Sequence, residues 1–161
     1  MDSRVGPLAE ILRLNTVLFR NCLDGLTDAN AAVRTSGETN SAAFIAAHLT
    51  NSRYFLLKQL GIDEPDPLAR YLDGRKAISE VAQMPPLSEV QDAWTRAAHL
   101  LRDRLATLSA AELEAPTTMR FPLSDGTLLS TLTFLVQHDS YHVGQLSLLR
   151  KYCGLPAMRF Q

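Results

Sequence analysis

Three histidines in this chain have the residue type and spacing needed to bind a metal ion. His138 and His142 are four residues apart in a segment with helical periodicity, and His48 lies in another such segment. A spacing of four places two side chains on one face of a helix, one turn apart, so both rings can reach a single ion. Three neutral imidazoles would leave one coordination position open, as catalytic zinc sites do.

The neighbouring apolar residues predict that these rings face the protein interior. The pair lies beside one apolar stripe, and His48 lies beside another. The stripes consist of Leu128, Leu132, Leu135, Leu146 and Leu149, and of Phe44, Ile45, Ser52 and Phe55. A buried polar group without a partner costs about 1–3 kcal/mol, so three in one core need an explanation. The sequence favours a metal site over core histidines that are hydrogen-bonded by Asn51, Gln137, Gln145 or backbone carbonyls.

The composition is typical of a globular domain and excludes some partners. At 161 residues and 46% hydrophobic, the chain is expected to form one domain, 1–161, with a sizeable core. Its 16 basic and 17 acidic residues are interspersed, so no basic block is available to follow a nucleic-acid backbone. The sequence has neither a signal-like start nor an apolar run of membrane-spanning length. We therefore expect a soluble, cytoplasmic protein without nucleic-acid or membrane partners.

The cysteines and the fourth histidine are not expected to be catalytic or metal-binding residues. Cys22 and Cys153 are too few and too far apart for a disulfide framework or a metal knuckle. Cys22 continues an apolar stripe and is expected in the core, and Cys153 is expected at a helix end. His99 falls about 200° around its helix from Ala97 of the apolar seam, which predicts a surface position rather than a ligand.

The periodicity of the whole chain predicts an all-α fold. Four segments have apolar residues at helical spacing, approximately residues 7–26, 41–60, 87–108 and 128–152. The connections at residues 62–86 and 109–126 are long. The first is expected to hold a short helix near residues 77–83, and the second a β-like stretch at residues 117–121. We predict a four-helix bundle with long crossover connections.

Residues at the segment ends support these boundaries. Polar side chains that can accept from the first backbone N–H groups precede or begin three of the segments. The candidates are Asn40 or Ser41, Ser88 in a capping box with Gln91, and Thr127. Gly61 and Gly154 follow the second and fourth segments and are expected to end them.

The combination of these motifs resembles the DinB-like superfamily. The resemblance rests on Ala-Ala-His48-Leu in the second segment and on His138-Asp-Ser-Tyr-His142-Val-Gly-Gln145-Leu after an Asp-Gly turn. The family includes YfiT-type metal-dependent hydrolases and metal-dependent thiol transferases. It implies a four-helix bundle with a three-histidine site, usually for zinc or nickel, and often a homodimer. His48, His138 and His142 match its ligand positions, and Gln145 matches a commonly polar one.

Two chemical functions and one structural function are open at this point. A bound divalent ion would lower the pKa of a water to about 7 and would deprotonate a coordinated thiol. We therefore expect a thiol-dependent S-transferase or a hydrolase acting on a small electrophile, with a low-molecular-weight thiol as a candidate cosubstrate. The alternative is a non-catalytic, metal-binding structural or regulatory dimer.

Other residues near the histidines are candidates for roles at the site. Asp139 occupies the place of the general base in zinc proteases, but it is shorter than Glu and no third ligand follows, so a protease is disfavoured. It is expected to accept from a ligand's N–H, to pair with a surface arginine, or to be solvated. Arg53, Tyr54 and Tyr141 are candidates for holding the electrophile, but the sequence favours packing or surface positions for them, with Arg53 solvated.

Apolar residues surround the last segment more fully than an exposed helix would allow. They are Leu129, Phe134, Val136, Val143 and Leu148. Either the crossover segments or a second subunit must cover them, and we expect a homodimer.

Overall fold

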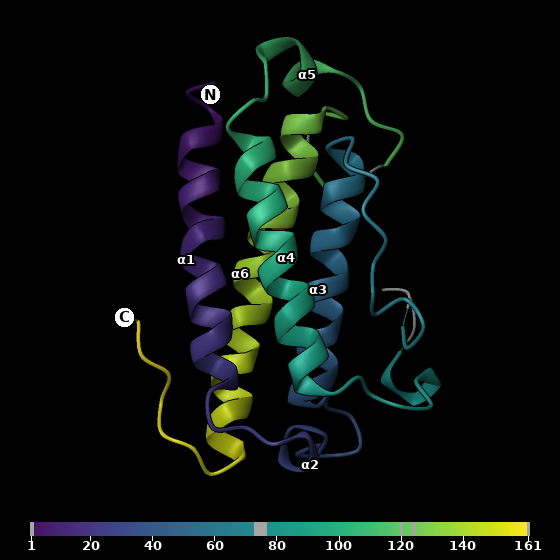
Figure 1. Cartoon of the computed structure of the whole chain (residues 1–161), viewed down its shortest axis with the longest axis vertical. Coiled ribbons are helices and arrows are strands. Elements are labelled where there is room, and N and C mark those ends of the chain that lie inside the picture. The colour runs from purple at the N-terminus through teal and green to yellow at the C-terminus, as the bar shows by residue number, and fades with distance from the viewer. Residues whose placement is uncertain (1, 73–76, 120, 124, 161) are drawn as a thin grey trace.

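Four long helices run side by side along the long axis of the molecule (Figure 1). The computed structural model describes residues 2–72, 77–119, 121–123 and 125–160. The long helices are α1 (Val5–Leu23), α3 (Ala42–Gln59), α4 (Leu87–Leu105) and α6 (Leu128–Tyr152). All four predicted segments are confirmed as helices. The first and third end at Leu23 and Leu105, rather than at residues 26 and 108.

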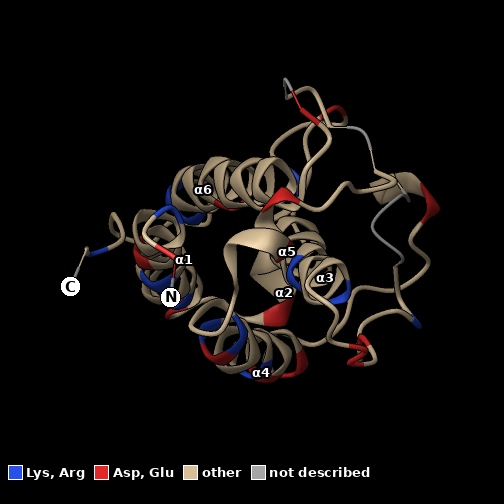
Figure 2. Ribbon diagram, turned by 90° about the horizontal axis from the view of Figure 1, so that it is seen from above, with Lys and Arg blue, Asp and Glu red and all other residues tan. Residues whose placement is uncertain are grey.

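Seen from above, the helices form a ring in which α1 packs on α4 and α6, and α3 packs on the same two helices (Figure 2). Helices α3 and α4 are parallel, as a hydrogen bond between their C-terminal ends shows. Arg104 near the end of α4 donates from Nε to the Leu60 carbonyl at the end of α3, at 2.8 Å. Helices α1 and α6 are also parallel, since Arg150 donates to the Cys22 carbonyl at 3.3 Å. The predicted four-helix bundle with crossover connections is therefore confirmed, and it sets α3 beside α6.

Short helices lie in the connections. Helix α2 (Asp28–Ala31) follows α1, and α5 (Ala110–Glu114) follows α4. A 3-10 helix, η1 (Ile78–Glu80), lies within the crossover where a short helix was predicted at residues 77–83.

The β-like stretch predicted at residues 117–121 does not form a strand in the described part of the chain. Its position 120 lies outside the described residues. The pairing is limited to an isolated antiparallel bridge between Pro116 and Thr127. The physical reason is that the opposing segment enters α6 at Leu128, so it is too short to extend a ladder.

The ends of α3 and α6 follow the local sequence signals. Ser41 Oγ accepts from the Phe44 N–H and Thr127 Oγ1 accepts from the Ser130 N–H, both at 3.2 Å, so both predicted N-caps are confirmed. Gly61 has a φ of +81° after α3, in the left-handed region that glycine adopts without strain.

The capping box predicted for Ser88 and Gln91 is wrong. Helix α4 begins at Leu87, so Ser88 is already helical, and Pro86 at the N-cap has no side-chain acceptor. The acceptor comes from another helix: Asp28 Oδ1 of α2 accepts from the Leu87 N–H at 2.8 Å. A carboxylate at this end also complements the helix dipole.

Trp94 is the largest fully buried side chain among the described residues. Its ring stacks on Phe19, with centroids 3.9 Å apart, and the Arg53 guanidinium lies 3.4 Å from the centroid of the Trp94 ring. Cys22 is buried in the core as predicted, and burial raises the pKa of its thiol to about 11. That thiol is therefore protonated and unreactive at neutral pH.

The chain itself covers much of α6. Val136 and Val143 are buried, Leu129 and Phe134 are partly buried, and Leu148 remains 54% exposed. Packing within the chain, including α1 on α6 and the Phe121 ring on Phe134, therefore accounts for part of the coverage that the apolar residues require, and the homodimer stays a prediction. Among the described residues, no helix has the length and apolarity needed to cross a bilayer.

Candidate metal centre

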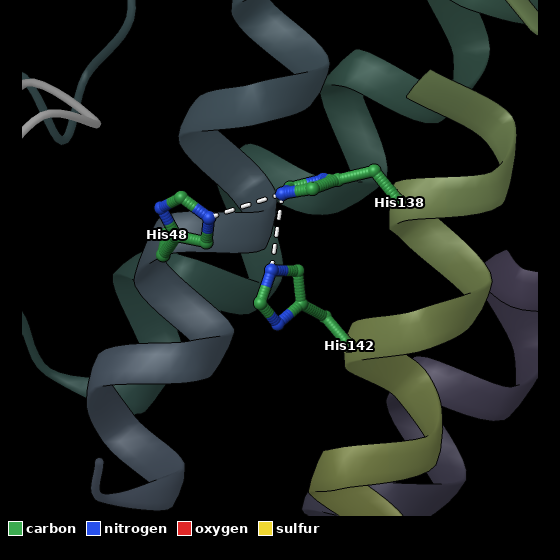
Figure 3. A group of neighbouring side chains, drawn as sticks. All are labelled: His48, His138 and His142. Atoms are coloured by element: carbon green, nitrogen blue, oxygen red, sulfur yellow. Dashed lines mark hydrogen bonds between the residues drawn. The ribbon is translucent and has the colours of Figure 1, made fainter. Parts of the chain in front are cut away.

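The three predicted ligands converge between α3 and α6 (Figure 3). Nε2 of His138 lies 3.0 Å from Nε2 of His142 and 3.3 Å from Nε2 of His48. Nitrogen ligands of a tetrahedral zinc ion, each about 2.0–2.1 Å from the metal, are about 3.3–3.4 Å from one another. Because the candidate ligand atoms of all three histidines lie within 4.8 Å of one another, they are close enough together for one ion to contact all of them.

Helix geometry and aromatic packing place these rings. His138 and His142 occupy one face of α6, while His48 projects from α3 across the interface (Figure 3). The Phe44 ring lies parallel to the His48 ring, and the Phe134 ring lies nearly parallel to the His138 ring, with centroids 6.1 and 6.3 Å apart. These contacts restrict rotation of the two imidazoles before any ion binds.

Burial keeps the imidazoles neutral, which is the form that binds metals. Burial and the neighbouring histidines lower the pKa of His48 and of His138 to about 4. Burial also lowers the pKa of His142, although its hydrogen bond with Gln145 and the charge of Asp139 oppose this effect. All three rings therefore present lone pairs at neutral pH.

The hydrogen bonds of the rings leave these lone pairs for a cation. His142 donates from Nδ1 to Gln145 Oε1 at 2.7 Å, so its Nε2 carries a lone pair. A neutral ring has one N–H, so at most one of the two contacts of His138 Nε2 is a hydrogen bond. The His138 Nδ1 atom is buried and has no hydrogen-bond partner in the described part of the protein. A single cation would satisfy all three converging Nε2 atoms.

Only one of the three side chains predicted as hydrogen-bond partners for core histidines is hydrogen-bonded to a histidine ring. Gln145 does accept from His142, but Asn51 instead donates to Asp66, and Gln137 is exposed. His99 is also exposed, as predicted, and does not belong to the cluster. The Nε2 contacts among the three rings therefore involve none of these predicted partners.

A buried ion pair joins the two helices that carry the ligands. Arg53 of α3 and Asp139 of α6 are each only 2% exposed. Arg53 donates from Nη2 to Asp139 Oδ2 at 2.8 Å and from Nε to Oδ1 at 3.3 Å. Arg53 also donates to Thr16 Oγ1 and to the Leu12 carbonyl, at 2.7 and 3.2 Å.

This arrangement corrects the sequence-based interpretation of both residues. Arg53 is neither solvated nor available to hold a substrate, and Asp139 pairs with a buried arginine rather than with a surface one or with a ligand's N–H. The physical reason is that each charge reaches its partner only when α3 packs on α6. Because Asp139 follows His138 directly, the pair fixes α6 against α3 next to the ligands.

Tyr54 packs in the interior and also contributes to the lining of a cavity next to His138, whereas Tyr141 is a surface residue. Tyr54 is buried and donates from its hydroxyl to the Ala93 carbonyl at 3.1 Å. Tyr141 is 57% exposed, and its hydroxyl accepts from Gln145 Nε2 at 3.1 Å. Through Gln145, Tyr141 supports the orientation of the His142 ring.

A cavity of about 580 Å³ reaches the site at His138. It lies between α3 and α6 and is bordered by the crossover after α3 and the loop before α6. The loop residues of the cavity are not predictable from the sequence, because no local pattern indicates which loop side chains fold over a helix interface. The lining includes Asn51, Phe55, Lys58, Asp63, Glu64, Asp66, Met119, Phe121 and Phe134.

The lowered histidine pKa values predict how the stability of the metal-free protein depends on pH. The unfolded chain gains protons near the ordinary pKa of 6.5, whereas folded His48 and His138 resist protonation until about pH 4. The free energy of unfolding is therefore expected to be highest above 6.5 and to fall as the pH drops towards 4. Urea unfolding at about pH 7 and about pH 5, with a chelator present, measures this change.

Matched variants test whether the buried histidines cause this pH dependence of stability. His48→Gln should reduce the loss of stability between the two pH values, while His99→Gln should leave it as in the parent protein. A parent protein whose free energy of unfolding is the same at both pH values would contradict the prediction.

Comparison with known proteins agrees with the fold and identifies the family. A profile of the DinB superfamily matches residues 11–146, a span that contains all three histidines. Among solved structures, the conserved protein of locus from Enterococcus faecalis has a TM-score of 0.71 and 16% identity, over 90% of this chain and 94% of that chain. That likeness supports the fold alone, and no curated protein matches the sequence. Because the profile spans most of the sequence, the chain belongs to the DinB superfamily.

Proposed function

We propose that this protein is a metal-dependent enzyme in which His48, His138 and His142 hold one divalent ion, zinc or nickel. The observation that carries the proposal is the convergence of three Nε2 atoms, with separations of 3.0 and 3.3 Å, beside a cavity that reaches His138. The reaction we favour is transfer of a low-molecular-weight thiol to a small electrophile. Hydrolysis of such an electrophile is the second candidate.

The ligand set supports chemistry rather than a purely structural role. Structural zinc sites normally have four protein ligands, often cysteines. In the described part of the chain, no fourth His, Cys, Asp or Glu joins the cluster. The Cys22 thiol contacts Met158, and the Cys153 thiol donates to the Asn30 carbonyl, so both are engaged elsewhere. An ion held by three imidazoles would have room for an exogenous thiol or water and would favour its deprotonated form.

Residues of the chain have defined tasks in this proposal. Gln145 keeps the N–H of His142 on Nδ1 and thus directs the Nε2 lone pair at the ion. Phe44 and Phe134 limit rotation of two ligand rings. The cavity next to His138 would hold the electrophile against the bound nucleophile, and positioning of this kind accounts for much of enzymatic rate enhancement.

The test presents zinc- or nickel-loaded protein with a panel of alkyl halides, epoxides and activated esters, together with several low-molecular-weight thiols. We expect turnover that requires both metal and thiol, is lost in His138→Ala, and persists in His99→Ala. Turnover without thiol would select the hydrolase.

A negative panel would be interpreted with the cobalt-substituted protein. Thiol binding to the ion should change its visible spectrum. If no electrophile reacts and no thiol alters the spectrum, the proposed enzyme is wrong, and the non-catalytic metal-binding role replaces it.

A further inference from the structure

One wall of the cavity beside the metal centre is aromatic. The Phe121 ring stacks on Phe134, with centroids 4.4 Å apart and planes 17° from parallel. Phe55 meets Phe121 edge to face at 6.3 Å, and Phe134 continues the wall to His138. The three phenylalanines are only partly buried and line the cavity. They therefore present apolar surface about the size of an aromatic ring to a bound small molecule, at the end of the cavity nearest His138.

A second part of the cavity lining is acidic. It is formed by the segment after α3 and contributes Asp63, Glu64 and Asp66 to the lining. Glu64 is paired with Arg96, so its charge is compensated. Lys58 is the one cation among the described residues that line the cavity, and it is exposed to solvent. The two remaining carboxylates give this wall a negative balance.

Asp66 is the less exposed of these two carboxylates, since Asp63 is open to solvent. Its Oδ1 accepts from the Leu68 N–H at 2.8 Å, and its Oδ2 accepts from the Asn51 side-chain amide. Both donors are neutral, and no described Lys or Arg forms an ion pair with Asp66. Burial raises the pKa of this carboxyl, which reflects the cost of its charge without a cation. A ligand cation in the cavity would relieve that cost.

We propose that the cavity selects an amphipathic organic cation, with an aromatic or aliphatic body against Phe55, Phe121 and Phe134 and a protonated amine towards Asp66. This inference rests on the proposed function, in which the same molecule is the electrophile. Its apolar end lies on the His138 side of the cavity, so the reacting carbon belongs to that end. Anionic substrates of the same shape are disfavoured by the acidic wall.

The test measures binding of three probes that share a ring and differ in charge: 2-phenylethylamine, 2-phenylethanol and 3-phenylpropanoate. Calorimetry or ligand-observed NMR is performed on the folded protein, both metal-free and zinc-loaded. We expect the amine to bind metal-free protein about tenfold more tightly than the carboxylate, with the alcohol between them. Measurement without metal separates this preference from direct coordination of the amine, and from failure of the proposed enzyme.

Two variants test the two walls. Asp66→Asn should remove most of the difference between amine and carboxylate, because the hydrogen bond to Asn51 survives a flip of the Asn51 amide while the charge is lost. Phe121→Ala should weaken all three probes by about fivefold. Asp103→Asn, at an exposed site outside the cavity, is the matched control and should change nothing.

The probe series in the parent protein tests the preference of the cavity for a cation even if a variant fails to fold. Equal or tighter binding of the carboxylate would overturn the proposal, as would failure of every probe to bind at millimolar concentration. Amine selectivity in a protein that never binds metal would support the cavity's preference while rejecting the proposed enzyme.

Discussion

Replacing Arg53 with alanine is expected to lower the free energy of unfolding by about 3–5 kcal/mol. The substitution would leave the Asp139 carboxylate buried with no cationic partner, because that side chain is only about as exposed as Arg53 itself, at 3% and 2%. It would also remove the guanidinium that packs on the Trp94 ring. Urea unfolding followed by circular dichroism, with a chelator present, measures the change.

Two further variants separate burial of the pair from its charge. Arg13→Ala removes an ion pair with Glu10 that is exposed on α1, and it is expected to leave the unfolding midpoint unchanged. The double variant Arg53→Met/Asp139→Leu removes both buried charges, so it should be more stable than Arg53→Met alone. If Arg53→Ala unfolds at the same urea concentration as the parent protein, the buried pair does not hold α3 to α6.

Metal binding should have an effect of similar size on stability. The untagged protein is expected to retain about one zinc or nickel ion per chain, bound by His48, His138 and His142. At a free zinc concentration about 1,000 times the Kd, binding should stabilise the folded state by about 4 kcal/mol. Elemental analysis gives the stoichiometry, and thermal unfolding with zinc or with chelator gives the stabilisation.

Single variants test which histidines bind the ion. His138→Ala and His142→Ala should lose both the bound ion and the zinc-dependent rise in Tm. His99→Ala removes an exposed imidazole from α4 and should behave as the parent protein. Full retention of metal by His142→Ala would show that the ion binds elsewhere.

The sequence by itself determined the features that depend on neighbours within a few positions. The helical segments follow from apolar spacing, and the caps at Ser41 and Thr127 follow from side chains that reach backbone N–H groups three residues ahead. The shared direction of His138 and His142 follows from one helical turn. The surface position of His99 follows from its angle to the apolar seam in the same way.

The convergence of His48 with that pair was predicted from its apolar stripe and from the family resemblance, and only the packing of α3 on α6 supplied the distances. Tertiary structure alone decided the partners that are distant in sequence. Arg53 and Asp139 are 86 residues apart, and Asp28 caps a helix that begins 59 residues later. The sequence instead favoured a local capping box for that helix and an exposed position for Arg53.

Tertiary structure alone also decided which loop residues line the cavity. Asp66 and Phe121 come from connections without periodicity, and they become wall residues because the two connections fold over the interface between α3 and α6. Helical periodicity predicts which face of a helix is buried, because burial of that face is needed in any packing arrangement. It does not predict which charge from another helix meets a buried charge, or which loop covers a groove, because both depend on how the helices are arranged around one core.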